Sequence, residues 1–341
     1  MPGHLWSRTW GGVKSRRGRA RHALAWTVRA PRPRPALIFA CALSALVAAR
    51  LVAQQPVTDN RVFHSGVEIT SLTATVTDKD GHPVTGLPRE AFEVYEDGVP
   101  QTITQFTRER VPIGLGVLLD ISDSMFGKRM DDARAAVDKF LFELLDPADE
   151  FFLMAFNHKP HPLTGWTREQ GDVRHALAGL RPSGGTAIYD TILDALPLIE
   201  RRNRQRAAIL VISDGADTAS TATLRELRPA LHRSDAFIYA IAIDSPERQP
   251  INTRVNAAAL REITAENGGR TEIVQNSAQL DEAAARVAEE LNSQYVLGYT
   301  PPRGADGQFH SLRVRIAGAD YRVRARNGYV ATPTGRKRSQ H

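Results

Sequence analysis

The chain is best understood from the stretch Ile113-Gly114-Leu115-Gly116-Val117-Leu118-Leu119, which runs directly into Asp120-Ile121-Ser122-Asp123-Ser124. The first seven residues form a short, nearly continuous apolar run, which is typical of a parallel strand buried on both faces. One acid and two hydroxyl residues follow at alternate positions, and a helical pattern begins near Lys128. Ligand sites of open α/β sheets lie at the carboxyl ends of strands. The sequence therefore predicts a site on this loop.

Strand-like and helix-like segments alternate over residues 111–293. Further strands are predicted at 150–156, 207–212, 237–243 and 271–274, with a short edge strand within 161–167. Apolar residues at helical spacing predict helices at 130–145, 172–180, 186–201, 224–232, 255–266 and 280–291. This alternation predicts an α/β fold with a doubly wound, mostly parallel sheet and helices on both faces, a Rossmann-like architecture.

Two more loops carry the same kind of residues as the first. Ser183-Gly184-Gly185-Thr186 opens a predicted helix, and Ser213-Asp214-Gly215 follows a predicted strand. If the two strands are neighbours, all three loops meet at one edge of the sheet. Hydroxyl and carboxylate oxygens are the ligands that Mg²⁺ prefers. The candidate metal ligands are Asp120, Ser122, Ser124, Thr186 and Asp214.

Each loop has a simpler explanation when taken singly, because Asp and Ser also form turns and cap helices. The presence of all three loops, in this order, favours metal binding. Asp123, Asp190 and Asp217 are interpreted as caps or supporting groups. His158 and His161 are interpreted as solvated loop residues, and no catalytic residue is predicted.

The amino terminus is strongly basic and then apolar. Residues 1–50 hold ten Lys or Arg and no Asp or Glu, and without them 34 basic residues face the chain's 38 acidic ones. The basic excess therefore belongs to the leader, and nucleic acid is not predicted as a partner. An apolar run at 36–49 follows. Residues 1–53 are predicted to be a signal peptide or, alternatively, an amino-terminal membrane anchor. Cys41, the chain's one cysteine, lies in this run.

The segments beside the α/β domain have strand-like patterns. Residues 60–110 are predicted to form a small β-sandwich-like module, and 294–331 to form β hairpins with one apolar and one arginine face. Residues 332–341 are predicted to be a disordered tail. In the first segment, the acidic turn with Glu93, Glu96 and Asp97 either binds a cation or, as the preferred interpretation, is a solvated hairpin.

The three loops together resemble, in order and spacing, the metal-ion-dependent adhesion site of von Willebrand factor type A (VWA) domains, over about residues 111–293. The resemblance implies direct coordination by Ser122, Ser124 and Thr186, with Asp120 and Asp214 mostly acting through water. Three further stretches resemble exported VWFA-related proteins of the acidobacterial type. They are Asp78-Lys79-Asp80-Gly81, Phe92-Glu93-Val94-Tyr95-Glu96-Asp97-Gly98 and Tyr295-Val296-Leu297-Gly298-Tyr299.

The functional expectation is an exported, non-enzymatic binding protein of the adhesion type. It would hold a divalent cation, Mg²⁺ by preference with Mn²⁺ or Ca²⁺ as alternatives, and through it grip an acidic side chain of a protein partner. One alternative is an envelope scaffold or assembly factor with a mainly structural metal. A metal-assisted hydrolase ranks below both, because no base is convincingly placed. The expected location is periplasmic or extracellular, with anchoring to the inner membrane as an option.

Overall fold

The computed structural model describes residues 69–214, 216–244, 257–318 and 320–332. The chain divides into two compact units, Met1–His64 and Ser65–His341, and every described residue belongs to the second. The predicted leader, Gly215, the start of the helix predicted at 255–266 and all but the first residue of the predicted tail lie outside the described residues. Within the described ranges, no helix combines the length and apolarity needed to span a membrane.

A six-stranded sheet forms the centre of the α/β part, in the order β10-β9-β8-β5-β6-β7. Five strands run parallel and β7 closes one edge in the antiparallel direction. The strands are β5 (Ile113–Asp120), β6 (Glu150–Phe156), β7 (Pro160–Pro162), β8 (Arg206–Ser213), β9 (Phe237–Ile243) and β10 (Thr271–Val274). The predicted fold class is confirmed. Strands β5 and β8 are hydrogen-bonded neighbours, which is the condition for their loops to meet.

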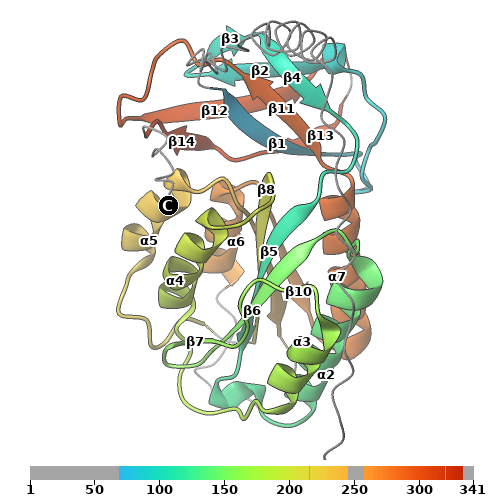
Figure 1. The fold of residues 1–341 in the computed structure, drawn as a ribbon, viewed down its shortest axis with the longest axis vertical. Helices are drawn as coiled ribbons and strands as arrows, with labels where there is room; N and C mark the ends of the chain where they lie inside the picture. The colour runs from blue at the N-terminus through green and yellow to red at the C-terminus, as the bar shows by residue number, and fades with distance from the viewer. Residues whose placement is uncertain (1–68, 215, 245–256, 319, 333–341) are drawn as a thin grey trace, which may run out of the picture. The chain divides into compact units, whose positions relative to one another are not determined.

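Helices cover both faces of this sheet, with α2, α3 and α7 on one side and α4, α5 and α6 on the other (Figure 1). Their bounds are α2 (Lys128–Lys139), α3 (Gln170–Ala178), α4 (Ile188–Glu200), α5 (Leu224–Arg233), α6 (Ala257–Glu266) and α7 (Ser277–Asn292). The helix predicted at 130–145 ends in a π-helical turn, η3 (Phe140–Leu144), rather than continuing as α-helix. The helix predicted from Thr186 begins two residues later, at Ile188, so Thr186 stays in the loop.

Strand β5 packs against both helical layers. Val117 and Leu119 lie in the core beneath α2 and α7, whereas Leu118 lies in the core beneath α4. Gly116 is required by the neighbouring strand, because a Cβ there would lie only 2.5 Å from the ring carbon Cζ of Phe152. The continuous apolar run is therefore explained by burial on both faces.

The segments before and after the α/β part jointly build two antiparallel four-stranded sheets, ordered β13-β1-β11-β4 and β14-β12-β2-β3. The strands are β1 (Thr70–Thr77), β2 (Phe92–Glu96), β3 (Val99–Gln101), β4 (Ile103–Thr107), β11 (Tyr295–Tyr299), β12 (Phe309–Ile316), β13 (Arg322–Arg324) and β14 (Gly328–Val330). Because β1 pairs with β11 and β2 with β12, each sheet combines both segments. The sequence did not predict this sharing, nor strand β14.

A buried polar contact joins the sheet that contains β1 to the central one. Arg206, the first residue of β8, donates to Oε1 of Gln294, and the Gln294 amide donates to Thr75 Oγ1 at 3.2 Å and to Tyr239 at 3.1 Å. That sheet therefore contacts the amino-terminal end of β8. The loops that follow β5 and β8 lie at the opposite ends of these strands.

Candidate metal centre

Asp120 is the last residue of β5, and its carboxylate is fully buried. One oxygen accepts the backbone N–H of Ser122 at 2.7 Å, and the other accepts the hydroxyl of Ser213 at 2.5 Å. Burial raises the pKa of Asp120 to about 7, and the nearby Asp214 carboxylate adds to this effect. The carboxylate thus fixes the turn after β5 and links it to the end of β8.

The two predicted serine ligands connect this turn to Asp214. Ser122 Oγ and Ser124 Oγ lie 3.0 Å apart, and Ser124 Oγ donates to Asp214 Oδ1 at 2.6 Å. Asp214 follows β8 directly and is fully buried, and this burial raises its pKa. Four of the five predicted ligands therefore lie together across the ends of two neighbouring strands.

The loop that carries Thr186 is fastened to the same turn through its backbone. Asp123 N–H donates to the Gly184 carbonyl at 2.9 Å, and Ser183 N–H donates to the Ile121 carbonyl at 2.8 Å. Thr186 is buried and hydrogen-bonds Thr218 through its backbone N–H and carbonyl. No hydrogen bond between described residues joins the Thr186 side chain to the other four. Its hydroxyl is thus left available to a ligand.

Arg129 is a residue of this centre that the sequence analysis missed. It lies in the first turn of α2, and its Nη1 donates to Asp214 Oδ2 at 3.0 Å and to the Ser124 carbonyl at 2.8 Å. Its side chain is only 12% exposed. An arginine at a helix start has no distinctive sequence signal, because most such residues are solvated. Only the fold shows that it reaches back to the loop.

The other polar residues near the centre make capping contacts. Asp217 accepts the N–H of Tyr189 at 3.0 Å, and Asp190 accepts the N–H groups of Thr221 at 2.7 Å and Ala222 at 2.9 Å. These bonds hold the start of α4 against the loop after β8. They match the roles that the sequence predicted for Asp190 and Asp217. His161 was predicted to be a solvated loop residue, but it lies in β7, is half-buried and bonds Asn157 at 3.0 Å, whereas His158 is exposed.

The donor set fits a hard divalent cation. It offers two buried carboxylates and three hydroxyl oxygens, and one guanidinium only partly compensates the two carboxylates. A cation between the carboxylates would favour their ionised forms and offset the desolvation that raises their pKa. Ser122, Ser124 and Thr186 would hold the ion, with Asp120 and Asp214 beside it. There it would supply a positive charge that can bind an anionic oxygen.

Comparisons with known proteins agree with this architecture. Residues 115–216 match the family model of the von Willebrand factor type A domain. The bovine (Bos taurus) inter-alpha-trypsin inhibitor heavy chain H4 is 24% identical over 210 residues, which are 55% of this chain and 22% of that protein. The chain thus spans about a fifth of the length of this curated relative.

Similar solved structures include the von Willebrand factor type A protein from Catenulispora acidiphila, with a TM-score of 0.47 and 12% identity over 77% of this chain and 73% of that one. The vWF domain of the type V pili tip protein Mfa5 from Porphyromonas gingivalis gives a TM-score of 0.43 and 14% identity, over 54% of this chain and 96% of that one. The family match covers β5, β6 and β8, and it identifies residues 115–216 of this chain as part of a von Willebrand factor type A domain.

Proposed function

We propose that this chain is an exported binding protein that grips a carboxylate of a protein partner through a bound divalent cation. One observation carries the proposal. The side chains of Ser122, Ser124 and Asp214 form a hydrogen-bonded chain beside Asp120, and the loop of Thr186 is fastened to the same turn. The ligands of a small ion are thus gathered before it binds, which lowers the cost of ordering them.

The charge at this centre favours an anionic partner group. Asp120 and Asp214 contribute two negative charges when ionised, and Arg129 contributes one positive charge. A divalent cation would change the local balance from about one negative to about one positive charge. A carboxylate from a partner would then complete the coordination of the ion and neutralise the excess. Binding would depend on the metal, because without it the centre repels an acid.

Mg²⁺ is the preferred ion, with Mn²⁺ and Ca²⁺ as alternatives. The set consists of oxygen donors only, and hydroxyl groups outnumber carboxylates. Mg²⁺ keeps several waters and needs few charged protein ligands. A site with only two carboxylates suits this behaviour.

An exposed aromatic side chain extends the proposed contact surface. Phe126 comes two residues after Ser124 and is 79% exposed, more than any other large apolar side chain among the described residues. Arg129 also lines a pocket of about 190 Å³, together with Lys128, Asp132 and Leu280. Aromatic and arginine side chains dominate the energy of many interfaces. We place the partner over Phe126 and this pocket.

Export remains part of the proposal and rests on the basic and apolar leader, which lies outside the described residues. Export would place the centre in the periplasm or outside the cell, where protein partners are accessible. Retention of the leader would anchor the chain to the inner membrane.

The test is capture of a partner from envelope extract by the full chain, with Mg²⁺ or with EDTA. Capture should require Mg²⁺ and should be lost in the D120A/S122A double variant, while D194A, which changes an exposed aspartate of α4, should behave as the original protein. F126A should weaken capture without changing Mg²⁺ affinity. Capture that persists in EDTA while the melting temperature falls would contradict the proposal and favour a scaffold with a structural metal.

A further inference from the structure

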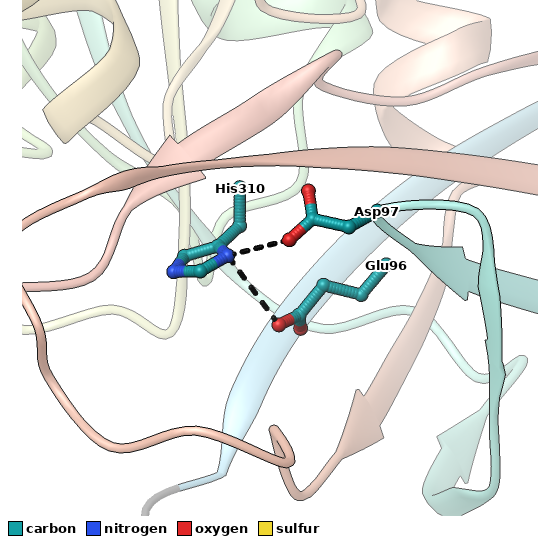
Figure 2. A group of neighbouring side chains, drawn as sticks. All are labelled: Glu96, Asp97 and His310. Carbon is teal, nitrogen blue, oxygen red and sulfur yellow. Dashed lines mark hydrogen bonds and ion pairs between the residues drawn. The ribbon is translucent and has the colours of Figure 1, made fainter.

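A second group of metal-ligating side chains lies in the β sheets, away from the loops of the α/β part. Glu96 ends β2, Asp97 follows in the turn, and His310 lies on β12 (Figure 2). One ligand atom from each side chain lies within 4.8 Å of the others. His310 Nδ1 is 2.8 Å from Asp97 Oδ2 and 3.8 Å from Glu96 Oε1. The three atoms therefore form a compact triangle.

The second nitrogen of the His310 ring is also held by a carboxylate. Nε2 lies 3.1 Å from Asp306 Oδ1, in the loop before β12. Histidines that bind metals usually donate their other N–H to a carboxylate or carbonyl, which fixes the ring and its tautomer. Asp306 is placed for this role. With the proton on Nε2, the Nδ1 lone pair would point at the two acids.

Glu96 has a buried oxygen directed into the cluster. The residue is 3% exposed, and its Oε2 accepts hydrogen bonds from Tyr299 and Tyr329. Its other oxygen, Oε1, faces His310 at 3.8 Å, beyond hydrogen-bonding distance. Glu96 Oε1 and Asp97 Oδ2 therefore both face the same ring nitrogen of His310. Asp97 and Asp306 add further negative charge, so one imidazole faces three carboxylates.

We propose that Glu96, Asp97 and His310 bind a divalent transition-metal ion of the Zn²⁺ type, oriented by Asp306. Ligands about 2.0 Å from a tetrahedral ion lie about 3.3 Å apart. The two observed distances from Nδ1, 2.8 and 3.8 Å, bracket that value. The ion takes the place of the proton on Nδ1, and that proton passes to solvent. One nitrogen and two carboxylates distinguish this centre from the oxygen-only centre after β5.

The ion would connect the segment before the α/β part to the segment after it. Asp97 and His310 are 213 residues apart in the chain, and β2 and β12 are paired strands. The chain has one cysteine, so no disulfide within it can make this connection. A bound ion would close a long loop and stabilise the folded state by its binding free energy. The proposed role is therefore a structural cross-link that is independent of partner binding.

The experiment is Zn²⁺ titration of the full chain by calorimetry, in the D120A/S122A background so that the first centre does not contribute. Visible absorption of the Co²⁺ form reports the nitrogen ligand directly. The variants are H310A and D97N. Asparagine tolerates the left-handed backbone at position 97, where φ is +49°, so D97N should keep the turn. H161A is the matched control, because His161 lies in the α/β part.

We expect one Zn²⁺ per chain, a higher melting temperature with Zn²⁺, and at least about tenfold weaker binding in D97N and H310A. D306A should weaken binding by roughly 10- to 100-fold and shift the Co²⁺ spectrum, because it removes the oxygen that accepts from the Nε2–H of His310 and so frees the ring. H161A should change none of these. Zn²⁺ affinity that is unchanged in folded D97N, or that is lost equally in H161A, would overturn the proposal and leave the cluster as an ion-pair network.

Discussion

Replacing Arg129 with methionine would leave the buried Asp214 carboxylate without the guanidinium that lies 3.0 Å from it. Methionine keeps much of the aliphatic length of arginine, so the change removes charge and hydrogen bonds more than packing. Arg129 also donates to the Ser124 carbonyl, so the variant loosens the loop as well. The substitution therefore tests whether the positive charge of Arg129 stabilises the loops after β5 and β8 when no metal is bound.

The expected loss can be estimated from the burial of the pair. Removing one partner of a buried ion pair costs about 3–5 kcal/mol. The Arg129 side chain is 12% exposed and Asp214 keeps its hydrogen bond from Ser124, so we expect the lower end, about 3 kcal/mol. In a protein of this size each kcal/mol lowers the melting temperature by roughly 2–4 °C, which predicts a fall of about 6–12 °C in EDTA.

Mg²⁺ should reduce this loss, because the ion would neutralise Asp214 in place of Arg129. By linkage, each 1.4 kcal/mol of recovered stability corresponds to about tenfold tighter Mg²⁺ binding in R129M than in the original protein. Thermal unfolding with EDTA and with saturating Mg²⁺, together with calorimetry, measures both effects. K128M is the control. Among the described residues, Lys128 forms an ion pair only with Asp132, which lies one turn further along α2 and is partly exposed. An equal loss of stability with and without Mg²⁺ would show that no ion neutralises Asp214 in place of Arg129.

Two further substitutions test the packing that positions the centre. G116A should lower the free energy of unfolding by about 1–3 kcal/mol, because its Cβ would lie 2.5 Å from Phe152. Urea unfolding measures this loss, and G165A, which adds a Cβ in open space, should be nearly neutral. Q294L should cost about 1–3 kcal/mol, because it leaves the buried Arg206 without one of its acceptors. An unchanged urea midpoint in Q294L would show that this contact contributes little.

The fold of the α/β part follows from the sequence because its strands are buried on both faces. Strand β9 was predicted with the bounds that the structure has, since Phe237–Ile243 is apolar throughout. The predicted helix bounds differed more from the structure. Helix α4 begins after Thr186, and the preceding loop is hydrogen-bonded through Ser183 to the turn after β5. Local pattern therefore fixed the elements, and long-range hydrogen bonds fixed their ends.

Contacts between distant segments could not be predicted from the sequence. The pairing of β2 with β12 depends on register between segments at opposite ends of the described chain, which no local pattern encodes. The acidic turn at Glu96 and Asp97 was noted, with a solvated hairpin preferred, yet Glu96 is buried against Tyr299 and His310. Arg129 has no signal beyond its position at a helix start. Strands β2 and β12, and the side chains of Glu96 and Arg129, meet their partners only when the fold has formed.

Calorimetric titration of Mg²⁺ into the full chain measures directly whether the loops after β5 and β8 hold a cation. We expect one Mg²⁺ per chain for the original protein and for D194A. We expect no measurable binding for D120A/S122A, whose folded state circular dichroism would verify. Mg²⁺ binding of unchanged affinity and stoichiometry in that folded double variant would show that these loops do not hold the cation.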